Sequence, residues 1–102
     1  MTTAEDIQKN LELRRCILET LYACFRELPY GLVELDQIAE TCVVDAQALN
    51  WNIVYLEKLK FVELDRSMDC PPYISCTAVI TALGIDLVEN QVEFEKKFHN
   101  FS

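Results

Sequence analysis

The chain has 102 residues, of which 51% are apolar, and its 17 acidic and 9 basic residues give a formal net charge of −8. This length predicts a single domain over residues 1–102, with enough apolar residues for a buried core. The negative charge disfavours nucleic acid and anionic membrane surfaces as partners. The presence of only 2 glycines and 3 prolines argues against an all-β or disordered protein.

The N-terminus and the cysteines indicate the compartment. The sequence MTTAEDIQKN is polar and acidic, which is not typical of a signal peptide, and no run of about 18 apolar residues predicts a membrane span. Several cysteines lie in helical apolar patterns, where a thiol acts as a small hydrophobe. A reduced, cytoplasmic chain is the simplest interpretation of its five cysteines, which are Cys16, Cys24, Cys42, Cys70 and Cys76.

A long N-terminal helix is predicted over residues 1–28. Thr2 or Thr3 is placed to cap it, and apolar residues then recur at spacings of three and four, apart from a polar step at Arg14–Arg15. Pro29 ends the pattern. The second half of this helix is apolar nearly all round, so we expect it to have contacts on two sides.

Two shorter helices are predicted within residues 35–59. A short strand signal at Val33 and Leu35 comes first, and Asp36 is placed to cap a helix over residues 37–42.

Asp45 is placed to cap the second of these helices, which ends near Leu59. Asn52 lies on its apolar face, where it either satisfies a buried backbone group or lies at the edge of the core. Its apolar positions are Leu49, Ile53, Leu56 and Leu59.

A β-hairpin is predicted over residues 61–80. Its first strand is residues 61–64. Its second strand is residues 73–80, whose side chains alternate in polarity, and a turn-rich loop with two prolines joins the two strands. Thr81 is then placed to cap one last helix over residues 82–98. The expected fold class is α+β and mainly α: a winged helix-turn-helix with a two- or three-stranded antiparallel wing and flanking terminal helices.

These segments resemble the winged helix-turn-helix of small prokaryotic transcription regulators, the group that includes the antibiotic-resistance and phenolic-acid repressors. The resemblance implies a homodimer, formed through the terminal helices, that places two recognition helices over residues 45–59 on double-stranded DNA. It rests on Leu35, Ile38, Ala39, Val44, Asp45, Leu49, Ile53, Leu56, Phe61 and Val62, and then on Ile80, Thr81, Gly84, Val88 and Glu89.

The chain departs from that group at the positions that touch DNA. The front of the recognition helix holds alanines, Gln47, Asn50 and Trp51 in place of the usual hydroxyl and basic residues. Lys60 replaces the usual glycine before the strand. Arg66 is the one basic residue at the wing tip, where these regulators usually carry several basic residues.

A DNA-binding regulator is the first functional hypothesis. Gln47 and Asn50 can form hydrogen bonds with the edge of adenine, and Trp51 can pack on a thymine methyl or a sugar. Basic side chains can hold phosphates. Alternatively, the two amides are solvated and Trp51 anchors a protein contact. The candidate DNA-binding residues are Gln47, Asn50, Trp51, Lys58, Lys60 and Arg66.

The second hypothesis is an acidic winged-helix module that binds protein, as an adaptor or as a DNA-mimicking antagonist, and does not bind DNA. Trp51 and Tyr55 lie one helical turn apart, which suits an interface, although both can instead pack on the first helix or the wing. Phe94 and Phe98 are further candidate partner-binding residues, for a homodimer through the terminal helices. The alternative is that they close the core of the monomer.

Catalysis, metal and cofactor sites have no support in the sequence. There is one histidine, His99, and no Gly-rich phosphate loop. Cys70 and Cys76 are not spaced like metal ligands. A redox-sensing role for Cys70 is a minor option, because the adjacent Asp69 raises the pKa of a thiol. We therefore expect a protein that is not an enzyme.

Overall fold

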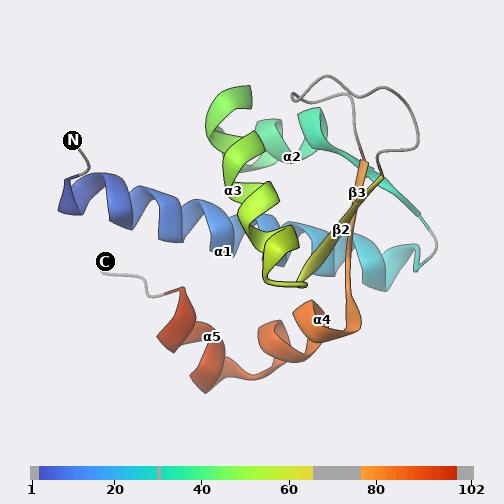
Figure 1. Cartoon of the computed structure of the whole chain (residues 1–102). Coiled ribbons are helices and arrows are strands. Elements are labelled where there is room, and N and C mark those ends of the chain that lie inside the picture. Colours follow the sequence, from blue (N-terminus) through green and yellow to red (C-terminus); the bar gives the residue numbers. More distant parts are fainter. Residues whose placement is uncertain (1–2, 30, 66–76, 99–102) are drawn as a thin grey trace.

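The structure is a computed structural model and describes residues 3–29, 31–65 and 77–98. It is mainly helical, with a small three-stranded antiparallel sheet (Figure 1). The order of elements is α1 (Ala4–Glu27), β1 (Val33–Glu34), α2 (Leu35–Cys42), α3 (Ala46–Lys58), β2 (Val62–Asp65), β3 (Thr77–Ile80), α4 (Ala82–Glu89) and α5 (Gln91–Lys97). The coarse α+β class with predominant helix is therefore confirmed.

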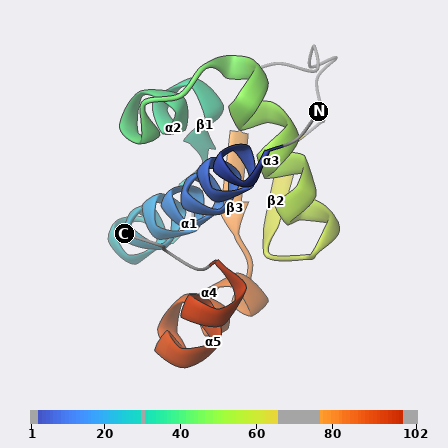
Figure 2. The same ribbon diagram turned by 90° about the vertical axis from the view of Figure 1, so that its left-hand side faces the viewer.

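Helix α1 forms the centre of the fold. It lies between α2 and α3 on one side and α4 and α5 on the other, and Figures 1 and 2 show this arrangement from two directions. It contacts α2, α3, α4 and β3, so the expectation of contacts on two sides is confirmed. Its buried side chains are Leu13, Ile17, Leu18 and Leu21.

Three helix caps were predicted correctly and one was not. The side chains of Thr3, Asp45 and Thr81 each accept a backbone N–H in the first turn of α1, α3 and α4. The prediction that Asp36 caps α2 is wrong, because α2 begins at Leu35 and its N-cap, Glu34, makes no side-chain cap bond. Glu34 pairs with β3, so the chain passes directly from the strand into the helix.

Strand β3 is the centre of the sheet, in the order β1-β3-β2. Its pairing with β2 runs from Val62 opposite Ile80 to Asp65 opposite Thr77, and Val33 of β1 lies opposite Ala78. Alternation along β3 buries Ala78 and Ile80. Residues 66–76, which include the predicted loop, Arg66 and the start of the predicted second strand, lie outside the described residues.

The prediction of one C-terminal helix over residues 82–98 is wrong, since α4 and α5 are separate helices that meet at Asn90. The backbone of Asn90 leaves the helical region, with φ −92° and ψ 90°, and its side chain accepts the N–H of Glu93 at 3.2 Å. This break turns α5 back beneath α1 (Figure 2). The Tyr22 hydroxyl on α1 donates to Glu89 at 2.7 Å, which raises the pKa of Tyr22.

The turn after α3 explains two positions of the sequence. Lys60 has a φ of 72°, in the left-handed region that favours glycine, and it occupies the position at which the resembling regulators carry glycine. Gly84 packs against the backbone of Phe61 so closely that a Cβ there would clash with the Phe61 carbonyl and lie 2.7 Å from Ile80 Cγ1. Both positions hold α3, β2 and α4 close together.

Candidate interaction surface on α1 and α3

Helix α3 presents one face to the core and the opposite face outward. Its first turn is fixed by Asp45, whose carboxylate accepts the N–H of Ala48 at 2.7 Å. Gln47, Trp51 and Lys58 are exposed along the outward face, and Asn50 is half-buried beside them. The buried face consists of Leu49, Asn52, Ile53 and Leu56.

Asn52 joins α3 to α1. Its side chain has no exposed surface, and its amide nitrogen donates to Ala48 O at 2.8 Å and to Asn10 Oδ1 at 3.2 Å. Its amide oxygen accepts from Arg14 Nε at 2.8 Å. Each polar atom of the Asn52 amide thus has a partner, as burial requires. The sequence did place Asn52 on the apolar face, and the backbone-satisfying alternative is the one observed.

Arg14 stacks on both aromatic side chains of the outward face. Its guanidinium carbon lies 4.0 Å from the centre of the Tyr55 ring and 5.3 Å from that of Trp51. Trp51 is 46% exposed and Tyr55 37% exposed. We call these three residues, Arg14, Trp51 and Tyr55, the Arg14 cluster. Its rings are supported from α1 on one side and open to solvent on the other.

The electrostatic surroundings of Arg14 differ from those of its neighbour. Burial lowers the pKa of Arg14, and Tyr55 offsets this in part. Arg15, by contrast, forms an ion pair with Glu95 at 2.5 Å and approaches Glu19 at 3.5 Å, and the hydrogen bond that it donates to Glu95 raises the pKa of Arg15. Among the described residues, no carboxylate forms an ion pair with Arg14.

The predicted DNA-binding residues do not form a basic surface. Lys58 and Lys60 are exposed near the end of α3, while Glu63 and Asp65 are exposed on the adjacent strand β2. Arg66 lies outside the described residues. Two exposed bases and two exposed acids therefore lie close in sequence at this end of α3, and the acids weaken the attraction that phosphates need.

The structure places Phe94 and Phe98 in the core, each 2% exposed. Their rings meet edge to face with centres 5.9 Å apart, and the Arg15 guanidinium lies 5.0 Å from the Phe94 ring. They close the monomer core, which was the alternative to partner binding. Phe94 and Phe98 are buried because the break at Asn90 directs α5 inward instead of along the axis of α4.

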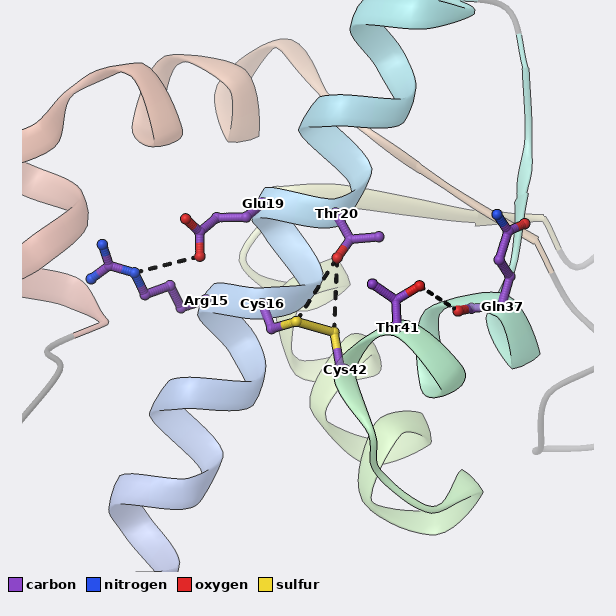
Figure 3. Close-up of a disulfide and its surroundings, with 7 residues drawn as sticks. All are labelled: Arg15, Cys16, Glu19, Thr20, Gln37, Thr41 and Cys42. Carbon is purple, nitrogen blue, oxygen red and sulfur yellow. Dashed lines mark hydrogen bonds and ion pairs between the residues drawn. A yellow bond between two sulfur atoms is a disulfide. The ribbon is translucent and has the colours of Figure 1, made fainter. Parts of the chain in front are cut away.

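A disulfide between Cys16 and Cys42 joins α1 to α2, and Figure 3 shows its surroundings. Cys16 lies two residues after Arg14 in α1. The Thr20 hydroxyl lies 3.9 Å from the sulfur of Cys16 and 3.8 Å from that of Cys42. The interpretation of a fully reduced chain is therefore wrong for this pair. Its members are 26 residues apart in sequence, and only the packing of α1 on α2 brings their Cα atoms to 6.0 Å.

Two features of this surface were missed by reasoning from sequence. The contact of Arg14 with both aromatic rings was not predicted, although the polar step at Arg14–Arg15 in an apolar helix was a signal that two bases interrupt the buried stripe. The pairing of Asn10 with Asn52 had no signal, because asparagines 42 residues apart carry no pattern that joins them.

Other kinds of site find no support in the part of the chain that the structure covers. Within residues 3–29, 31–65 and 77–98, no group of three His, Cys, Asp or Glu side chains is arranged to hold a metal ion, and no helix has the length and apolar content to cross a bilayer. Cys70, Cys76 and His99 lie outside these ranges. Comparisons of the chain with protein-family models, with curated proteins and with solved structures gave no match, so similarity assigns it to no family.

Proposed function

We propose that the chain is a winged-helix domain that works as an acidic protein–protein interaction module. The winged-helix assignment is supported by the order helix, strand, helix, helix, strand, strand from α1 to β3, and by the position of β3 between β1 and β2. Only residues 43–45 separate α2 from α3, a length typical of a helix-turn-helix.

The observation that carries the interaction function is the Arg14 cluster. Two large aromatic side chains stay about half exposed on the outward face of α3. Tryptophan, tyrosine and arginine are the residue types most enriched at the centres of protein interfaces. The hydrogen bond that Arg14 Nε donates to the buried Asn52 holds the cluster in place before binding, which lowers the entropy cost of association.

The net charge supports a protein partner over a nucleic acid. A chain with a net charge of −8 repels a phosphate backbone on average. The same field attracts a protein with a basic surface and accelerates the encounter. An adaptor, or an antagonist that competes with nucleic acid for a basic protein, matches this combination of charge and exposed rings.

The test is affinity capture from the lysate of the source cell, with wild-type protein compared with Trp51→Ala and with Val92→Ala. Val92 is a matched control, because it is an exposed apolar residue (63%) of α5, and α5 lies on the opposite side of α1 from α3 (Figures 1 and 2). A captured protein is then purified and its affinity measured by calorimetry. We expect Trp51→Ala to weaken binding about 30-fold, as ~2 kcal/mol for a central aromatic residue implies. Equal affinities for the three proteins would contradict the proposal.

DNA binding as a dimeric transcription regulator is the second candidate. It is favoured by the outward face of α3, which carries Gln47 beyond the Asp45 cap and ends with Lys58. The test is a titration of duplex fragments from the upstream region of the gene at low and moderate salt, with Gln47→Ala and Lys58→Ala as variants. Absence of binding at low salt would remove this candidate.

The proposed dimer has its own requirement. Because Phe94 and Phe98 are buried, a dimer through the terminal helices has to use exposed apolar residues of those helices, such as Ile7 of α1 and Leu83 of α4. Sedimentation at high concentration tests this, since a species with only the monomer mass would end the dimer proposal.

A further inference from the structure

We propose that the Arg14 cluster is a receptor for one carboxylate of the partner, the side chain of an aspartate or glutamate flanked by apolar residues. This inference rests on the proposed function and names the chemistry that the partner presents. Its basis is an arginine that is held in position by its neighbours and forms no ion pair with any carboxylate of the described residues.

The guanidinium of Arg14 has an unused edge. Its Nε donates to Asn52, and no hydrogen bond within the described residues uses its Nη1 or Nη2. Neither Nη atom is among the buried polar atoms that lack a partner, so both reach solvent. A carboxylate accepts two parallel bonds from such a pair of N–H groups, which is the strongest geometry for this contact.

The orientation of this edge is set by several independent contacts. Asn52 Oδ1 accepts the hydrogen bond from Arg14 Nε. The amide of Asn52 is itself held by its bonds to Ala48 O and Asn10 Oδ1. The Tyr55 and Trp51 rings hold the plane of the guanidinium. An arginine that is ordered before binding loses less side-chain entropy when the ligand arrives.

Among the residues that the structure covers, Arg14 has no carboxylate as an ion-pair partner, although the chain is rich in acids. Acids outnumber bases by 17 to 9, and the neighbouring Arg15 is paired with both Glu19 and Glu95. Burial lowers the pKa of Arg14 with no acid to reverse the shift. A carboxylate of a partner would supply the negative charge that no described residue places beside Arg14.

The surroundings favour a protein carboxylate over a phosphate chain. The exposed Trp51 and Tyr55 rings offer apolar contact area beside the charge, which suits apolar residues flanking a single acid. A polyanion meets the full repulsion of a molecule with a charge of −8, whereas one carboxylate in a neutral or basic segment does not.

The experiment is an NMR titration of isotope-labelled protein with two capped peptides, acetyl-Leu-Glu-Leu-amide and acetyl-Leu-Gln-Leu-amide, and with inorganic phosphate. We follow the Nε–H signals of Arg14 and Trp51. We expect a saturable shift with the Glu peptide and an affinity about tenfold lower for the Gln peptide, because a charge-assisted hydrogen bond is lost. Equal responses to the two peptides, or a larger response to phosphate, would overturn the proposal.

Two variants make the titration specific. Arg14→Gln is expected to abolish the preference for the Glu peptide. Arg26→Gln is the matched control and should retain it, because Arg26 also stacks on a ring of α1, that of Tyr22 at 5.8 Å, but is exposed. An unchanged preference in Arg14→Gln would overturn the proposal. If the Glu peptide does not bind but Trp51→Ala still loses the protein partner, the carboxylate proposal is wrong and the proposed interaction function stands.

Discussion

Val43 is a β-branched residue in the left-handed conformation, with a φ of 54°, at the C-cap of α2. Such a conformation costs roughly 1–2 kcal/mol for an L-residue, and the side chain gains little in return because it is 87% exposed. Glycine adopts this conformation without strain but loses more entropy on folding. We expect Val43→Gly to raise the free energy of unfolding by up to about 1 kcal/mol, measured by urea denaturation.

Val92→Gly is the matched control for this substitution. Val92 is also an exposed valine, but it lies within α5, where glycine weakens a helix by about 1 kcal/mol. The two identical substitutions should therefore act in opposite directions. A lower stability for Val43→Gly would show that the conformation at Val43 is not strained.

Gly84 is placed where no side chain fits. A Cβ would clash with the Phe61 carbonyl, and backbone cannot yield as a flexible side chain can. We expect Gly84→Ala to destabilise the protein by about 1–3 kcal/mol, as overpacking does. Gly31→Ala is the control in the same denaturation experiment, because its Cβ would lie 3.1 Å from Leu28 Cβ, a residue that is exposed and can move. Equal effects of the two substitutions would contradict the close packing of α4 on Phe61.

The Cys16–Cys42 disulfide acts at the scale of elements, because it joins the central helix α1 to the end of α2. A bond across 26 residues restricts the unfolded chain and stabilises the folded state by about 3 kcal/mol. A surface hollow of about 420 Å³ opens on both cysteines, so a small thiol reductant can reach them. We expect a reductant to lower the free energy of unfolding by about 3 kcal/mol.

Two variants assign this effect to the bond. The double variant Cys16→Ala, Cys42→Ala should be destabilised and insensitive to reductant, whereas Cys24→Ala, which removes a free thiol, should keep the wild-type response. Peptide mapping of the alkylated protein identifies the linked pair directly. Free thiols at both positions under oxidising conditions, together with no effect of reductant, would exclude the bond.

The whole molecule carries an excess of acids that repel each other in the compact state. Raising NaCl from about 0.01 M to about 0.15 M shortens the screening length from about 30 Å to about 8 Å. We expect the melting temperature to rise by a few degrees, roughly what 0.5–1 kcal/mol produces in a domain of this size. The response should shrink in Glu40→Gln, Glu63→Gln, which removes two exposed acids. A melting temperature that falls with salt would show that ion pairs outweigh the repulsion.

Much of the fold followed from local patterns. The caps at Thr3, Asp45 and Thr81 were predicted because a short polar side chain before an apolar period is a local signal. Strand β3 follows from alternation, and β2 follows from a short run of strand-forming residues. The break at Asn90 was missed because the apolar period continues through it. The start of α2 was missed because Glu34 is held by strand pairing, which no cap signal reveals.

The sequence by itself determined the mainly helical α+β class, the order of its elements, the negative charge and the aromatic pair Trp51 and Tyr55. Those properties depend on residue types and on spacings within a few turns. Only the tertiary structure decided that Arg14 stacks on these rings, that Asn52 joins α3 to α1, that Cys16 bonds Cys42, and that Phe94 and Phe98 are enclosed. Each of these depends on the way α1 packs against distant segments, and contacts between distant segments leave no periodic trace in a single sequence.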